Sequence, residues 1–311
     1  MTQTLATGVG PTPRAPVAAP VGRRAADRWS RRAPLLPALI FAILVTQIPF
    51  LVTLYLSTLD WNALRPGERG FVGLANYAEV LTDTRLRAAL TNTVVLTAGA
   101  VVASVLLGLG IAILLDRRFP GRGIVRTLLI TPFLVMPMAA ALLWKHAIYN
   151  PAYGLINGIL GGSTDWVSQY PMLSVVATLV WQWTPFMMLI ILAGLQSQST
   201  EILEAARVDG AGAWQVFIRI TLPHLRPYLE LGALLGSIYL VQTFDAVFTI
   251  TQGGPGTATT NLPYEIYLTT FRKFEYGEAA AAGVVVVIGT IVVATFALRV
   301  ISSLFRMEGA R

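Results

Sequence analysis

The 311-residue sequence has no cysteine, only two histidines and only two lysines. The absence of cysteine excludes disulfides, thiolate nucleophiles, Cys-ligated zinc and iron–sulfur clusters. The histidines, His146 and His224, lie far apart in sequence, which argues against a histidine metal site. Neither Lys145 nor Lys273 ends a G-x-x-x-x-G-K-[ST] loop, and the sequence contains no G-x-S-x-G or H-E-x-x-H motif. The common signatures of nucleotide-binding, hydrolase and metalloprotease sites are therefore missing.

Charge is also scarce. Charged residues make up 13% of the sequence and hydrophobic residues 55%, whereas ordinary globular chains carry about 25% charged residues. A chain this apolar could not cover a soluble surface with polar groups. The composition excludes a soluble enzyme and an intrinsically disordered protein, and it indicates a multispanning membrane protein.

Long apolar runs define the expected architecture, because a transmembrane helix needs about 20 mostly apolar residues. The sequence predicts an all-α membrane protein whose domain, residues 35–306, holds six spans at about 35–59, 91–115, 125–146, 173–195, 228–248 and 279–304. The fifth span is the least uniformly apolar of these, since Glu230 and Asp245 fall inside it.

Residues 1–34 precede the first span and carry several prolines and a cluster of arginines. This composition is too polar and too proline-rich to fold alone, so we expect a disordered basic arm. A signal peptide is the alternative. The following apolar stretch is longer than the 7–15 residues of a signal sequence, and no clear cleavage site follows it, which favours an uncleaved first helix.

The distribution of basic residues predicts the orientation. If the N-terminus lies in the cytoplasm, the cytoplasmic segments hold 16 of the 23 Lys and Arg residues and the outer segments hold 7. This split favours both termini inside. The net charge of +7 is then a topology signal, and a nucleic-acid patch is the weaker interpretation.

The segment 199–223, between the fourth and fifth spans, has the most informative pattern. Ser199 or Thr200 can cap a helix, and Gly210 and Gly212 break it. A second short helix would start near Ala213 and stop before Pro223. Two short helices at a glycine bend form either a plain interfacial hairpin or a mechanical link between two spans, and the pattern alone leaves both open. A helix-turn-helix DNA reader is disfavoured, because acidic residues cancel the basic ones.

The same segment resembles the EAA loop of binding-protein-dependent ABC importer permeases. That motif is E-A-A, three residues, G, nine residues, I-x-L-P, and the sequence fits it without a gap. The resemblance implies the core of a type I importer permease, in which this loop docks into a cleft of an ATP-binding subunit. It assigns the docking role to Glu204, Ala205, Ala206, Asp209, Gly210, Ile220, Leu222 and Pro223.

The resemblance also implies the rest of the assembly. We expect two ATP-binding subunits, a second homologous permease of different sequence, an extracytoplasmic solute-binding protein, surrounding membrane lipid and no nucleic acid. ATP and Mg²⁺ would bind the partner ATPase subunits, and this chain would bind no cofactor and perform no catalysis. The expected location is the bacterial cytoplasmic membrane.

Two further stretches resemble the carbohydrate-uptake branch of this family. Residues 71–77 resemble its F-x-G-L-x-N-Y motif, and residues 244–255 resemble its F-D-x-x-x-x-x-T-x-G-G-P motif. These motifs imply that the solute is a carbohydrate or a polyol.

Candidate residues for the solute pathway lie at mid-depth in the fourth span and along the fifth. Trp181, Gln182 and Trp183 form either a cavity lining or ordinary helix packing. Tyr239, Gln242 and Asp245 follow at steps of three, which predicts one broad face of a helix. Asp245 could instead be a solvated helix end.

A secondary carrier or channel that works without an ATPase is the alternative function. Such carriers usually place ionisable groups or broken helices at mid-depth. The sequence shows little of this, so energy from another subunit is the favoured interpretation.

Overall fold

The computed structural model describes residues 33–65, 67 and 69–306, so the arm predicted for residues 1–34 lies almost entirely outside the described part. The chain divides into two compact units, Met1–Val52 and Thr53–Arg311. The first unit contributes a short 3-10 helix, η1 (Ala33–Leu35), and most of helix α2 (Leu36–Leu56).

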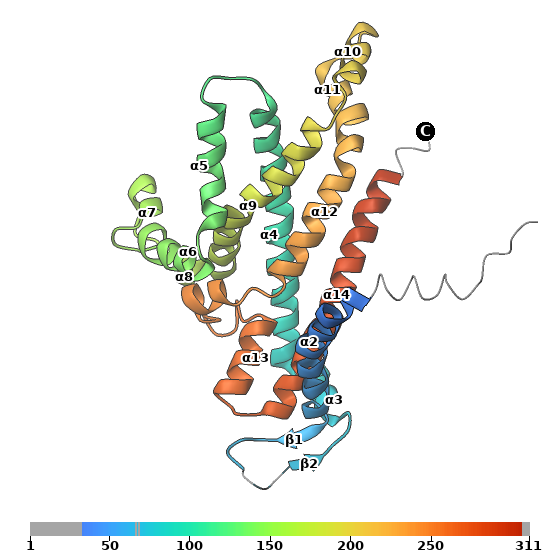
Figure 1. Ribbon diagram of the computed structural model, residues 1–311. Helices are drawn as coiled ribbons and strands as arrows, with labels where there is room; N and C mark the ends of the chain where they lie inside the picture. The colour runs from blue at the N-terminus through green and yellow to red at the C-terminus, as the bar shows by residue number, and fades with distance from the viewer. Residues whose placement is uncertain (1–32, 66, 68, 307–311) are drawn as a thin grey trace, which may run out of the picture. The chain divides into compact units, whose positions relative to one another are not determined.

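The second unit is predominantly helical, with one small antiparallel hairpin (Figure 1). The elements η2, η3 and η4 are turns of π-helix. In chain order the elements are β1 (Leu59–Trp61), β2 (Arg69–Phe71), α3 (Ala75–Thr82), α4 (Thr84–Asp116), α5 (Arg122–Leu134), α6 (Pro137–Leu143), η2 (Trp144–Ile148), α7 (Leu155–Leu160), α8 (Trp166–Gln169), α9 (Pro171–Gln196), α10 (Thr200–Val208), α11 (Ala213–Val216), η3 (Phe217–Thr221), α12 (Leu222–Leu240), η4 (Val247–Thr251), α13 (Leu262–Phe271) and α14 (Tyr276–Arg306).

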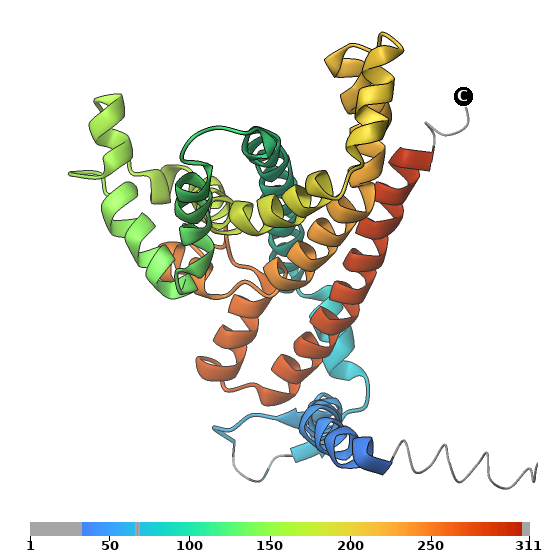
Figure 2. The same ribbon diagram turned by 45° about the horizontal axis from the view of Figure 1, so that its top comes forward.

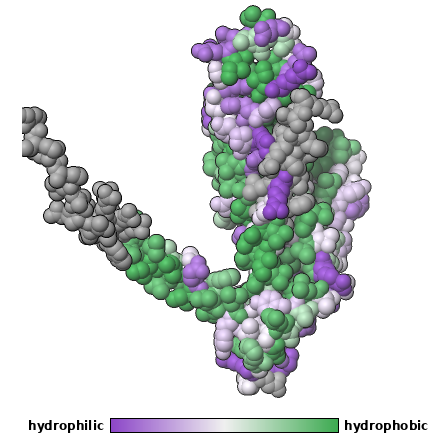
Figure 3. Space-filling model, turned by 90° about the vertical axis from the view of Figure 1, so that its right-hand side faces the viewer, coloured by the Kyte–Doolittle hydropathy of each residue, from purple (hydrophilic) through white to green (hydrophobic). Residues whose placement is uncertain are grey.

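Within the described residues, α2, α4 and α9 are each long and apolar enough to cross a membrane. Helix α5 followed by α6 and η2 forms a bent pair that counts as a fourth crossing. Hydrophobic side chains dominate the middle of the second unit, and hydrophilic ones gather at the α10–α11 end and at the β1–β2 end (Figure 3). This distribution is typical of a membrane protein whose central apolar belt contacts lipid.

The predicted third span, 125–146, is not one helix. The chain bends by 100° between α5 and α6, because Pro132 and Pro137 flank the bend and Met136, which precedes a proline, takes an extended conformation. The carbonyl of Val135 left free at the bend accepts a hydrogen bond of 3.0 Å from Gln182 Nε2 on α9. The break is therefore stabilised by a side chain from another helix.

The predicted fifth span, 228–248, also differs in the structure. Helix α12 begins earlier, at Leu222, and ends at Leu240. A turn follows, and the carbonyl of Thr243 accepts a hydrogen bond from Asn261 Nδ2 instead of continuing the helix. The predicted single helical face of Tyr239, Gln242 and Asp245 is thus wrong, because only Tyr239 lies on α12.

Helices α4 and α9 form the most extensively packed pair, and α12 packs on both of them. Buried residues at this junction include Leu96 of α4, Met187 and Ile191 of α9, and Leu225 of α12. Burying a side chain of this size contributes about 1.5–3 kcal/mol. This three-helix core positions the segments that carry the candidate site.

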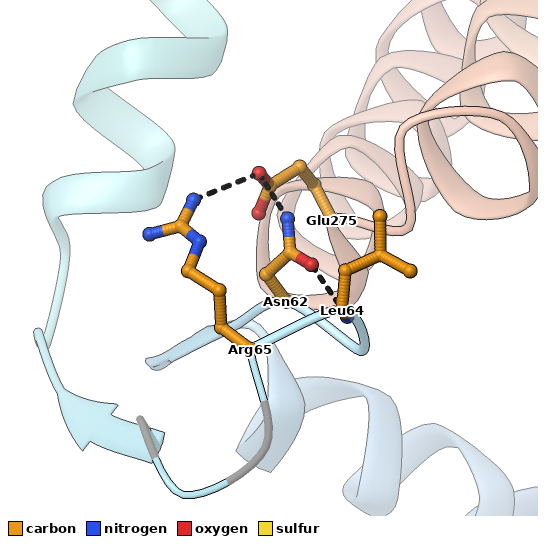
Figure 4. A network of polar contacts seen from close by, with 4 residues as sticks. All are labelled: Asn62, Leu64, Arg65 and Glu275. Atoms are coloured by element: carbon orange, nitrogen blue, oxygen red, sulfur yellow. Dashed lines mark hydrogen bonds and ion pairs between the residues drawn. The ribbon is translucent and has the colours of Figure 1, made fainter.

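The β1–β2 end is anchored to the start of α14 by a polar network (Figure 4). Asn62 Nδ2 donates to Glu275 Oε1 at 2.6 Å, and Arg65 Nη2 lies 3.3 Å from the same oxygen. Asn62 Oδ1 also accepts from the backbone N–H of Leu64 at 2.7 Å. The two contacts with Glu275 join segments that are more than 200 residues apart in sequence.

The Gln182–Val135 bond generates a test of the broken span. We expect Gln182→Leu to lower the free energy of unfolding by about 0.5–1.5 kcal/mol, because the substitution leaves the half-buried Val135 carbonyl without its donor. The measurement is the thermal unfolding midpoint of the purified protein in lipid nanodiscs. Gln196→Leu, at an exposed position of the same helix, is the matched control, and equal midpoints for the two variants would contradict the assignment.

Candidate functional site

The loop between α9 and α12 projects beyond the ends of the neighbouring helices α4 and α5 (Figures 1 and 2). Helix α10 ends in a Schellman motif: the N–H of Ala211 bonds to the carbonyl of Ala206 at 3.0 Å, and that of Gly210 bonds to Arg207 at 3.1 Å. Gly210 has φ +82°, which a residue with a Cβ adopts only at a cost. The E-A-A residues therefore lie in the last two turns of α10, Asp209 is the C-cap residue, and the G of the motif is the residue that follows the cap.

The surface of this loop is exposed and mixes large apolar side chains with charged ones. Val208 is 88% exposed and Trp214 is 71% exposed, and the Trp214 ring stacks on Phe217. Glu204 and Ala205 are also exposed, whereas Ala206 is half-buried. Large apolar side chains exposed next to acidic ones are typical of a surface that binds another protein.

The second half of the loop does not form a separate helix, and the prediction of a stop before Pro223 is wrong. Helix α11 passes through the π-turn η3 directly into α12. The N–H of Leu222 bonds to the carbonyl of Phe217, and Pro223 then occupies the first turn of α12, where proline is tolerated. Leu222 packs on the core formed by α9 and α12, and Ile220 is half-buried. The I-x-L-P residues thus lie where the loop continues without a gap into α12.

A second candidate site is a cavity of about 340 Å³ beside the α5–α6 break. Trp183 forms its centre: its ring lies 5.6 Å from Tyr239, 5.6 Å from Phe186 and 5.7 Å from Phe133, measured between centroids. The lining residues are Phe133, Val135, Pro137, Gln182, Trp183, Phe186 and Tyr239. None of them is charged, and four are aromatic. Gln182 is only 6% exposed, and its amide is held by the Val135 carbonyl.

The structure separates the six predicted pathway residues. Gln182, Trp183 and Tyr239 line the cavity together. Trp181 lies in an apolar groove of about 680 Å³ between α4, α5 and α9, and its ring packs on Trp144. Gln242 is exposed in the turn after α12, and Asp245 is half-buried beyond that turn. Neither Gln242 nor Asp245 lines the cavity.

Phe133 and Phe186 belong to the cavity but were not among the residues expected from the sequence. Phe186 lies three residues after Trp183, which places both on one face of α9. That spacing could have identified Phe186. Phe133 joins the cluster through the tertiary packing of α5 against α9, and no local pattern predicts this contact.

The loop at residues 251–260, which carries the T-x-G-G-P residues, is held by hydrogen bonds rather than by a helix. Thr251 Oγ1 lies 2.7 Å from Thr259 Oγ1, and Asn92 Nδ2 of α4 donates to the carbonyls of Thr257 and Thr260 at 2.8 and 2.9 Å. Lys145 Nζ donates to the carbonyl of Thr249 at 2.7 Å. The bonds from Asn92 and Lys145 give backbone carbonyls of this segment their hydrogen-bond donors.

The F-x-G-L-x-N-Y residues hold the β1–β2 hairpin in the same manner. Asn76 Nδ2 donates to the carbonyls of Ser57 and Leu59 at 2.9 Å each, and the Tyr77 hydroxyl lies 2.6 Å from Ser57 Oγ. Across the residues that the structure describes, no group of three or more His, Cys, Asp or Glu could hold a metal ion.

Comparison with known proteins identifies the family. Residues 104–307, more than half of the chain, match the family described as binding-protein-dependent transport system inner membrane component. A probable ABC transporter permease protein of Sinorhizobium fredii, y4oQ, is 38% identical over 252 residues, which cover 79% of this chain and 81% of the relative. The trehalose transport system permease protein SugA of Mycobacterium tuberculosis is 32% identical over 267 residues, covering 85% and 86%.

Among solved structures, a chain of a bacterial alginate ABC transporter, crystallised in complex with an alginate pentasaccharide-bound periplasmic protein, shares the fold. The TM-score is 0.75 at 20% sequence identity, and the match covers 89% of this chain and 95% of that chain. The expected family and fold class are confirmed. The chain belongs to the permeases of binding-protein-dependent ABC importers, which are multispanning membrane subunits that transport a solute while a separate subunit hydrolyses ATP.

Proposed function

We propose that this permease transports a neutral carbohydrate and that the cavity around Trp183 is part of its route. The absence of charge from the cavity lining supports this proposal, since a sugar presents apolar C–H faces and neutral hydroxyls. Aromatic rings pack against the former, and the exposed hydroxyl of Tyr239 can pair with the latter. A polyol offers the same groups and is included in the proposal.

The comparisons support the same class of solute. The relative SugA is a trehalose permease, and a relative from Thermococcus litoralis is a trehalose/maltose permease. An ionised solute is disfavoured, because the cavity offers no counter-charge to replace its hydration. We assign Trp183, Gln182 and Tyr239 to the route and keep Gln242 and Asp245 as candidates nearer its outer end.

The α10–α11 segment, we infer, is the surface that docks into the ATP-binding subunit. Its exposed Val208 and Trp214 supply apolar contact, and the Schellman cap at Gly210 gives α10 a defined end. Glu204, Ala205 and Asp209 lie on the exposed surface of the same helix end. Ile220, Leu222 and Pro223 connect this surface to α12.

The assembly that we propose contains two ATP-binding subunits that hold ATP and Mg²⁺, a second and different permease, and an extracytoplasmic solute-binding protein. Both termini of this chain lie in the cytoplasm. The C-terminal end of α14 and the α10–α11 segment lie at the same end of the second unit, which supports this orientation.

One prediction of the proposed function concerns the solute route. Trp183→Leu should lower uptake of radiolabelled trehalose or maltose by roughly tenfold, because it removes the central ring of the aromatic cluster. The measurement is uptake by proteoliposomes that contain the complete importer. Trp181→Leu changes the same residue type on the same helix but faces a different groove, and it should transport normally. Equal losses in both variants would contradict the assignment.

Another prediction of the proposed function concerns the docking loop. Gly210→Ala should uncouple ATP hydrolysis from uptake, because alanine disfavours the left-handed backbone of the cap by about 1 kcal/mol while its Cβ meets no neighbouring atom. Glu204→Gln should act in the same direction.

Two matched controls accompany these loop variants. Gly212→Ala alters a nearby glycine whose φ is −67°, and Glu201→Gln alters an exposed acid in the first turn of α10. Both controls should couple normally. Normal uptake per ATP hydrolysed in Gly210→Ala would refute the docking assignment.

A further inference from the structure

The base of the docking loop is closed by side chains from the end of α9 and the first turns of α12. Ser197 Oγ lies 2.9 Å from the Tyr228 hydroxyl and 3.1 Å from His224 Nε2. Ser197 Oγ also donates to the carbonyl of Gly194 at 2.8 Å, and His224 Nε2 lies 3.2 Å from the same carbonyl. Ser197 Oγ and the Gly194 carbonyl thus both lie within hydrogen-bond distance of His224 Nε2.

The backbone of α9 also contacts α12 at this point. A Cβ at Gly194 would lie 2.7 Å from the Tyr228 ring and 2.9 Å from the Leu225 side chain. Such distances leave no room for a larger residue, and Leu225 is fully buried. The base of the loop is therefore held by close packing and by hydrogen bonds together.

The contact at the base of the loop and the contact at the aromatic cavity lie the same distance apart on both helices. Gly194 lies eleven residues from Trp183 on α9, and Tyr228 lies eleven residues from Tyr239 on α12, a rise of about 16 Å along each helix. The two helices run antiparallel, so one pair of contacts joins them at the loop and another joins them at the cavity. Met187 fills the space between, because a Cβ at Gly236 would meet its side chain.

We propose that Ser197, His224 and Tyr228 form a latch that makes the docking loop move as one body with α9 and α12. These are positioning residues: they touch no solute and transmit the displacement of α10 to Trp183 and Tyr239. The proposal rests on the proposed docking function of the loop. A simple helix cap requires only the Ser197–Gly194 bond, whereas the two α12 side chains close a loop across 27 and 31 residues.

The test uses the complete importer in proteoliposomes and needs no knowledge of the solute. The sequence has no cysteine, so a single cysteine at the exposed Gln242 position beyond α12 reports movement near the outer end of the route. Its reaction rate with a membrane-impermeant maleimide is measured without nucleotide and after trapping with ATP and vanadate. With the latch intact, we expect nucleotide to change this rate.

In Ser197→Ala and Tyr228→Phe backgrounds, we expect the nucleotide-driven change to shrink by roughly fivefold, while ATP hydrolysis and subunit co-purification persist. Tyr228→Phe removes only the hydroxyl and keeps the ring that packs on Gly194, so the fold is preserved. The double variant should be no worse than either single variant, because both break one network. Ser197→Thr retains a hydroxyl and should restore coupling. Ser199→Ala, whose side chain makes no capping bond, is the matched control.

Each contrary outcome identifies what fails. A wild-type response in both Ser197→Ala and Tyr228→Phe, beside a lost response in Gly210→Ala, overturns the latch and leaves the docking function standing. A wild-type response in Gly210→Ala overturns the docking function. If nucleotide leaves the label unchanged even with the latch intact, neither proposal survives. If the nucleotide-driven change in labelling falls only as much as the amount of assembled complex falls, Ser197, His224 and Tyr228 stabilise the fold and do not transmit movement.

Discussion

The antiparallel contact between α9 and α12 is the constraint on which the site depends. These helices carry the exposed loop at one end and the aromatic cavity about 16 Å away along the helix axes, and they contact one another along the interval between. Gly194, Met187 and Trp183 of α9 meet α12 at successive levels. Closely packed interiors switch between discrete arrangements rather than deform continuously. In the function that we propose, this contact transmits a displacement of the loop to the cavity, so that ATP hydrolysis by a separate subunit drives transport.

The second constraint is that backbone polar groups at membrane depth need partners within the protein. The chain breaks its regular helices at the α5–α6 bend and again after α12, and each break is met by an amide side chain: Gln182 at Val135 and Asn261 at Thr243. These breaks also shape the site. The bend opens the space into which Phe133 and Pro137 project, and the turn after α12 leaves Tyr239 60% exposed near the end of its helix. The residues that line the candidate route are thus found next to the helix breaks.

Much of this organisation could be predicted from the sequence, because hydropathy over 20 residues is a local property and the EAA pattern is contiguous. The cap at Gly210 follows from the same local rules. The breaks could not be located in this way. Pro132 and Pro137 signal a disturbance, but the local sequence shows neither that the chain bends by 100° nor that Gln182, 47 residues away, donates to the Val135 carbonyl. The end of α12 carries no proline or glycine, and Asn261 becomes its partner only through tertiary structure. The aromatic cavity and the base of the docking loop likewise combine residues from different helices.

The most direct test of rigid transmission is the distance between spin labels on cysteines at Glu201, in α10, and Leu231, at an exposed position of α12, measured by pulsed electron paramagnetic resonance in the functional importer. If the loop and α12 move as one body, the distance distribution is the same without nucleotide and in the ATP- and vanadate-trapped state. A shift of the distribution on trapping would show that the loop hinges at its base, and it would contradict the account.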